Sequence, residues 1–186
     1  MGKRTDSSVS SLFEWVVVFV LALAFFFALR TFVIAPYTVP SASMEPTIQI
    51  GDNVFAEKLS VRFGDGVRPG DIAIFHNPEA GTEHDILVKR VIARGGQTVD
   101  LIDGRVVVDD KPLDEPYTVG KSLPLPTQAY GIEFSFPFVV PDGYFWMMGD
   151  NRENSADSRY FGPVSEDSMI GRVVFRYWPL DRIGSV

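Results

Sequence analysis

Two serine hydroxyls lie close together in the stretch VPSASMEPT, residues 39–47. One of them, Ser43, could act as a nucleophile while the other, Ser41, donates a hydrogen bond to the developing oxyanion. A neutral serine hydroxyl is a weak nucleophile and needs a base. The two histidines, His76 and His84, lie in polar segments typical of solvated loops, so the chain offers no convincing Ser-His-Asp set. A plain turn with capping hydroxyls is the alternative interpretation.

A lysine in a predicted strand could supply the base. The run ILVKRVIA, residues 86–93, predicts a strand in which Lys89 shares one face with Leu87 and Val91. Apolar surroundings remove hydration from the amine and lower its pKa, and the adjacent Arg90 is expected to act in the same direction. A neutral lysine can take a proton from serine, as in the Ser-Lys variant of the catalytic triad. The alternative is an edge strand whose lysine amine lies in water and blocks aggregation.

A third candidate is the polar loop MGDNRENSADSRY, residues 148–160. Within it, Ser155 could contact a neutral amine. Two carboxylates could pair with arginines, Asp150 with Arg90 and Asp157 with Arg159. The alternatives are an ordinary polar loop closed by ion pairs or a loose imitation of a calcium loop. The carboxylate spacing does not match an EF-hand.

These candidates follow a long apolar segment. Residues 15–29 carry no charge and no helix breaker, and residues 12–35 reach the length that a bilayer span needs. The segment is apolar on every side, which disfavours a surface helix. A cleaved signal peptide is disfavoured because Pro36 directly follows Ala35, and a buried core helix usually has a polar face. We therefore expect an uncleaved membrane anchor that ends at Pro36.

Basic residues predict the orientation of this anchor. Lys3 and Arg4 precede it, whereas residues 36–56 contain no Lys or Arg. The positive-inside rule then makes residues 1–11 a short cytoplasmic tail. Residues 36–186 would form an extracytoplasmic domain.

The pattern after the anchor predicts a mostly β domain, compact and resembling a barrel or a sandwich. Short alternating runs predict seven strands, at 52–58, 71–75, 86–93, 97–102, 105–108, 144–148 and 169–177. Residues 103–104, Asp-Gly, predict a hairpin turn. Residues 111–141 contain six prolines and are expected to be irregular. The aromatic run at 134–140 is either a core strand or a surface that touches lipid.

Composition excludes several classes of function. The net charge of −7, without a basic stripe, argues against binding to nucleic acid. The chain has no cysteine and two histidines, which excludes disulfides, thiolate catalysis and cysteine-based metal sites. We expect no metal and no organic cofactor.

Five sequence blocks in register resemble the bacterial type I signal peptidases, which are membrane-bound Ser-Lys proteases. The segment FVIAPY (32–37) resembles the approach to the family's nucleophile, and PSASMEPT (40–47) matches its P-S-x-S-M-x-P-T box. GDIAIF (70–75), KRV (89–91) and GDNRENSADSRYFG (149–162) resemble three further blocks in the same order. The chain departs at RGGQ (94–97), where L-P-G-D is frequent, and at Glu153, where Asp is common. These departures concern local loop shape.

The resemblance implies a role for each candidate residue. Ser43 would be the nucleophile and Lys89 the general base, with Ser41 and the Ser43 backbone N–H forming the oxyanion hole. Ser155 would orient the Lys89 amine, and Met44 would help to form the floor of the substrate pocket. Two ion pairs would be structural, namely Asp150–Arg90 and Asp157–Arg159.

The resemblance also implies the substrates and the location. The partners would be the lipid bilayer and preprotein signal peptides, cut after small residues in an Ala-x-Ala pattern at the plasma membrane. Two alternatives stay open. One is a membrane-tethered β-domain that binds extended peptides without catalysis. The other is a relative that processes a special substrate, such as a pilin.

Overall fold

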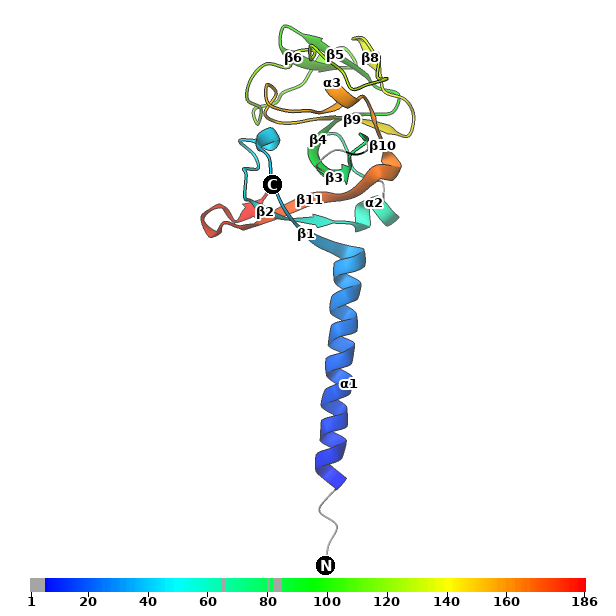
Figure 1. Ribbon diagram of the computed structural model, residues 1–186, viewed down its shortest axis with the longest axis vertical. Coiled ribbons are helices and arrows are strands. Elements are labelled where there is room, and N and C mark those ends of the chain that lie inside the picture. Colours follow the sequence, from blue (N-terminus) through cyan, green and yellow to red (C-terminus); the bar gives the residue numbers. More distant parts are fainter. Residues whose placement is uncertain (1–5, 65, 80, 82–84) are drawn as a thin grey trace, which may run out of the picture.

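The computed structural model describes residues 6–64, 66–79, 81 and 85–186, with side chains described from Ser11 onward within the first helix. His84, predicted to lie in a loop, is outside the described residues. Helix α1 (Asp6–Ala28) continues into a π-helical turn, η1 (Leu29–Val33). Figure 1 shows α1 projecting away from a β domain. The stretch Ser11–Val33 is long and apolar enough to cross a membrane, and none of it is buried against the rest of the protein.

The helical segment ends at Val33, two residues earlier than expected. Residues 34 and 35 belong to strand β1 (Ile34–Thr38), which pairs with strand β2 (Asn53–Glu57). Pro36 therefore lies inside a strand and does not stop a helix. Strand β1 is at the edge of its sheet, where the missing N–H of a proline is tolerated.

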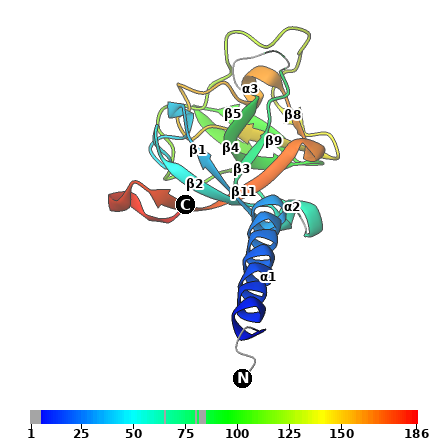
Figure 2. The ribbon, with the colours of Figure 1, turned by 60° about the horizontal axis from the view of Figure 1, so that its bottom comes forward.

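Most strands form one curled antiparallel sheet. Its order is β1-β2-β11-β3-β4-β9-β10, with β12 also paired to β11. The remaining members are β3 (Ile72–His76), β4 (Ile86–Arg94), β9 (Tyr144–Met148), β10 (Val164–Ser165), β11 (Met169–Trp178) and β12 (Gly184–Ser185). Figure 2 shows β1, β2 and β11 crossing beside the end of α1, with the other strands stacked beyond them.

A second, smaller sheet has the order β7-β6-β5-β8. Its strands are β5 (Thr98–Ile102), β6 (Arg105–Val108), β7 (Lys111–Pro112) and β8 (Phe138–Val139). The short helical elements are η2 (Ala42–Met44), α2 (Leu59–Phe63), α3 (Ser158–Phe161), η3 (Glu166–Ser168) and η4 (Leu180–Arg182). The mostly β prediction is confirmed, and each of the seven predicted strands has a counterpart. His76 is an exposed final residue of β3 and not a loop residue as expected.

The aromatic run at residues 134–140 is part of the core. The rings of Phe134, Phe136 and Phe138 surround Trp146, with centroid distances of 5.2, 5.7 and 5.0 Å. Figure 1 shows β8 at the end of the domain remote from α1. The three phenylalanines are half-buried against this core, which agrees with the core interpretation, although within the run only residues 138–139 form a strand. The distance of β8 from α1 disfavours the lipid-contact alternative.

Candidate active site

The turn that carries Ser43 is fixed from both sides. Met44, fully buried in one core cluster, anchors η2 from within. From outside, the Asn151 N–H donates to the Ser43 carbonyl at 3.1 Å, and Asn151 Nδ2 donates to the Ala42 carbonyl at 3.2 Å. Because these bonds fix the backbone on both sides of its Cα, Ser43 has a defined position. Asn151 belongs to the polar loop that follows β9.

Lys89 reaches this turn from the middle of the main sheet. Its Nζ donates a hydrogen bond to Ser43 Oγ at 2.6 Å, although the two residues are 46 positions apart. Strand β4 pairs with β3 on one side and β9 on the other, and Lys89 is 3% exposed. The edge-strand interpretation is therefore wrong, because a central strand places this amine in the protein interior.

Burial lowers the pKa of Lys89 from its ordinary value of 10.5 to about 8. The carboxylates of Asp157 and Asp150 oppose this shift, and the Arg159 guanidinium adds to it. The sequence predicted that Arg90 would add to the lowering, whereas the arginine that acts on the amine is Arg159. Arg90 is next to Lys89 in the strand and forms a buried ion pair with Asp150.

A small cleft opens beside the two groups. Ser41 is exposed at its rim, with its Oγ 3.3 Å from Ser43 Oγ. The cleft leaves about 30 Å³ of free space. It is lined by Val39, Pro40, Ser41, Ser43, Met44, Ile86, Leu87, Val88 and Lys89. Met44 lines this cleft, and its role as the floor of a substrate pocket stays a prediction.

Ser155 lies near the turn but does not bind the amine. Its Oγ is buried and has no hydrogen-bond partner among the described residues. A Cβ added at Gly149 would collide with Ser155 Oγ and with the Ser43 carbonyl, so the loop packs tightly here. The orientation of Lys89 by Ser155 stays a prediction.

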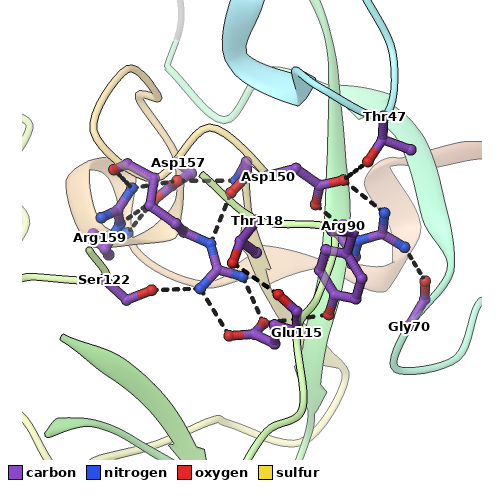
Figure 3. A network of polar contacts seen from close by, with 12 residues as sticks. Thr47, Gly70, Arg90, Glu115, Thr118, Ser122, Asp150, Asp157 and Arg159 are labelled. Atoms are coloured by element: carbon purple, nitrogen blue, oxygen red, sulfur yellow. Dashed lines mark hydrogen bonds and ion pairs between the residues drawn. The ribbon is translucent and has the colours of Figure 1, made fainter. Parts of the chain in front are cut away.

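Both predicted ion pairs are present, within one network of polar contacts (Figure 3). Asp150 accepts from Arg90 Nε and Nη2 at 2.8 and 2.6 Å, and from the Thr47 hydroxyl at 2.6 Å. Asp157 accepts two bonds from Arg159 at 2.9 Å each and one from the Gly149 N–H at 3.0 Å. These bonds tie the polar loop to the end of β9 and to the Ser43 turn.

A third arginine completes the network, and sequence reasoning missed it. Arg152 is 1% exposed and binds the Glu115 carboxylate, the Ser122 hydroxyl and the Gly149 carbonyl. The ring of Tyr117 stacks on Arg90 at 3.9 Å. Arg152 stands in the conspicuous GDNR block, which was a usable signal. Its partners lie in the proline-rich segment, where no local pattern indicates them.

Among the described residues, no group of three or more His, Asp or Glu side chains could hold a metal ion. The site thus consists of a hydroxyl, a desolvated amine, a second hydroxyl and a rigid ionic frame. This set of groups can carry out acyl transfer through a serine ester.

Known proteins are similar in sequence to this chain along most of its length. The family described as "Signal peptidase, peptidase S26" matches residues 12–178. A probable signal peptidase I-2 of Synechocystis is 40% identical, covering 89% of this chain and 72% of the relative. A signal peptidase I of Leptolyngbya laminosa is 36% identical, covering 95% and 85%. Signal peptidase IB of Staphylococcus aureus is 33% identical, covering 90% of each chain.

A solved signal peptidase I from Enterococcus faecalis V583 has a TM-score of 0.45 and 32% identity, covering 57% of this chain and 95% of that chain. The family match and the identities of the curated relatives extend far beyond the active-site blocks. The chain is a hydrolase, and it belongs to the signal peptidase family, peptidase S26.

Proposed function

We propose that this protein is a membrane-anchored endopeptidase that cleaves signal peptides from preproteins with a Ser43–Lys89 dyad. Membership of the signal peptidase family supports signal-peptide cleavage. The observation that carries the dyad is the buried 2.6 Å hydrogen bond between Lys89 Nζ and Ser43 Oγ. A base within hydrogen-bond reach of its nucleophile meets the geometric requirement for general-base catalysis.

In the first step Ser43 Oγ attacks the scissile carbonyl while neutral Lys89 takes the hydroxyl proton. The negative charge that develops on the carbonyl oxygen is stabilised by the Ser41 hydroxyl and the Ser43 N–H. One donor of this kind contributes about 3–4 kcal/mol to transition-state stabilisation. Protonated Lys89 then delivers its proton to the leaving amine, which breaks the peptide bond and leaves an acyl ester on Ser43.

In the second step Lys89, neutral again, takes a proton from a water molecule that attacks the ester. The ester bond breaks, and the proton returns through Lys89 to Ser43 Oγ. Both steps need a neutral Lys89, and a lysine at its ordinary pKa is almost wholly charged at neutral pH. Burial lowers the pKa of Lys89 and so raises the fraction of the amine that is neutral. No metal or organic cofactor is part of this proposal.

The small cleft supports a preference for small residues before the cut, in the Ala-x-Ala pattern. It holds about 30 Å³ of free space, and the buried Met44 contributes to its lining. Residues 86–88 at the start of β4 also line it, so an extended peptide could bind beside this strand. A bulky side chain would need the residues that line this cleft to move.

The anchor keeps the proposed dyad near the membrane. Ser43 lies ten positions after Val33, so it can be no more than about 33 Å from the end of the helical segment. Residues 1–11 would lie in the cytoplasm and the β domain outside the plasma membrane, following the distribution of basic residues. Membrane-inserted substrates would then reach the dyad without leaving the bilayer surface.

The proposal is tested by digesting a precursor that ends its signal in Ala-x-Ala with the purified full-length protein in neutral detergent. Mass spectrometry should find one cut after the second Ala. A precursor with Phe in place of that Ala should stay intact. Cleavage of both precursors at the same rate would contradict the proposed specificity, and cleavage of neither would contradict the proposed activity.

The pH dependence of cleavage follows from the lowered pKa of Lys89. Only the neutral amine can accept the Ser43 proton, so kcat/KM should fall about tenfold per pH unit below pH 8 and level off above it. The measurement is a pH profile of kcat/KM on a peptide without ionisable side chains. A rate that keeps rising to pH 10 would contradict a desolvated amine.

A further inference from the structure

A second cleft adjoins the segment that carries Ser43. This cleft is lined by Glu45, Pro46, Gln49, Val119 and Asn151, and it has a volume of about 350 Å³. It shares no lining residue with the cleft that contains Ser43 and Lys89. Met44 lines the first cleft and the next residue, Glu45, lines the second, so the two clefts are neighbours along this turn.

Asn151 connects the two clefts physically. It lines the second cleft, and its two hydrogen bonds hold the carbonyls of Ala42 and Ser43. A peptide whose residues before the cut occupy the first cleft has its scissile carbonyl at Ser43. The second cleft adjoins the same turn, so it lies within reach of the residues after the cut.

We infer that the second cleft binds the mature side of the substrate, that is, the first residues after the scissile bond. This inference rests on the proposed function. The wall of the cleft is rigid, because the Val119 N–H donates to the Asp150 carbonyl and the Arg152 N–H donates to the Val119 carbonyl, both at 2.9 Å. The buried Glu115–Arg152 ion pair also joins the segment that contains Val119 to the loop that contains Asn151.

The lining residues indicate what this cleft selects. Glu45 forms no ion pair in the part of the chain that the structure describes, so its carboxylate is available to a ligand. Gln49 and Asn151 carry amides, and Val119 is 52% exposed and presents an apolar surface. The cleft therefore favours a mature side that carries a cation and disfavours one that carries a carboxylate.

The other large clefts do not adjoin the nucleophile. One lies between α2 and η3, another is lined by residues of the segment 104–122, and a third is lined by residues of α1, η1, β1 and β2. None of these three contains a residue of the Ser43 turn. Among these clefts, the one at Glu45 adjoins the turn and can receive the chain after the cut.

The test uses three peptides with the same Ala-x-Ala sequence before the cut and Lys, Gln or Asp at the second position after it. The full-length protein in neutral detergent at low salt should cleave the Lys peptide about fivefold faster than the Asp peptide, in kcat/KM. Glu45→Gln should abolish this difference and Glu45→Lys should reverse it. Both variants should keep the natural urea unfolding midpoint, which shows that the fold is intact.

The matched control is Glu166→Gln, which removes one negative charge from an exposed residue in the cleft at η3. It should keep the fivefold difference. Equal cleavage of the three peptides by the unmodified protein, or the same loss of the difference in Glu166→Gln and Glu45→Gln, would overturn this inference alone. Failure to cleave any peptide would overturn the proposed function and this inference with it.

Discussion

Ser43→Ala and Lys89→Met should each lower kcat/KM for an Ala-x-Ala precursor by at least about four orders of magnitude. In the proposed mechanism, the first variant removes the oxygen that attacks, and the second removes the group that accepts its proton over the 2.6 Å hydrogen bond. The double variant should be no slower than either single variant, because the two groups act as a unit. The measurement is single-turnover cleavage with excess enzyme.

The Lys89→Met variant also shows that loss of activity is not loss of fold. The folded-state pKa of Lys89 is about 8, below its ordinary value of 10.5, so its burial destabilises the native state. This penalty is fully present below pH 8 and disappears as pH rises through 10.5. Lys89→Met should therefore be more stable than the natural protein at pH 7, by about 3 kcal/mol. An inactive variant that is less stable at pH 7 would contradict the account.

Arg159→Met should lower the free energy of unfolding by about 3–5 kcal/mol. The Asp157 carboxylate has no exposed surface, and the substitution would leave it buried without its cation. Because the Arg159 charge helps to lower the pKa of Lys89, the midpoint of the pH profile should also move upward. Urea unfolding followed by the fluorescence of the buried Trp146 measures the first effect, and the kcat/KM profile measures the second.

The matched control is Arg172→Met, which breaks two ion pairs, with Glu57 and Asp71, of an arginine whose side chain is 39% exposed. Exposed pairs contribute about 0–1 kcal/mol, so this variant should unfold near the natural midpoint and keep the natural pH profile. Equal destabilisation by the two substitutions would show that burial does not set the importance of the Asp157–Arg159 pair.

The strands of this protein could be predicted because their pattern is local. The alternation of apolar and polar residues marked seven strands, including β4 and β11, within a residue or two of their ends. Strand β1 was missed because Ile34 and Ala35 continue the apolar composition of the anchor. Only pairing with β2 makes these residues a strand, and their partners, Glu57 and Ala56, are too far along the chain to affect the local pattern.

Predicting the site required two kinds of information, the identity of its residues and their contacts in the folded chain. The candidate residues Ser43 and Lys89 followed from residue type and from the resemblance to a family, but their contact depends on the placement of β4 between β3 and β9. The charge that acts on the amine was assigned to Arg90, the neighbour in sequence. In the folded chain that role belongs to Arg159, brought close by the loop after β9.

The network of ion pairs and hydrogen bonds around Ser43 and Lys89 was the least predictable part of the site. Glu115 binds Arg152 from 37 positions away, in a proline-rich segment that gave no periodic signal. Through the Val119 and Asn151 backbone, this same segment supports the carbonyl of Ser43. Long-range ion pairs of this kind are set by tertiary packing, so sequence spacing alone could not indicate them.

The central claim is that the Lys89 amine titrates near neutrality while it lies beside Ser43. Lysine-selective ¹³C labelling, with the Cε shift of each of the five lysines followed against pH by NMR, tests it directly. The Lys89 signal is assigned by its absence in Lys89→Met. We expect this signal to titrate with a midpoint near pH 8. A midpoint near the ordinary 10.5 would place the amine in water and contradict the dyad.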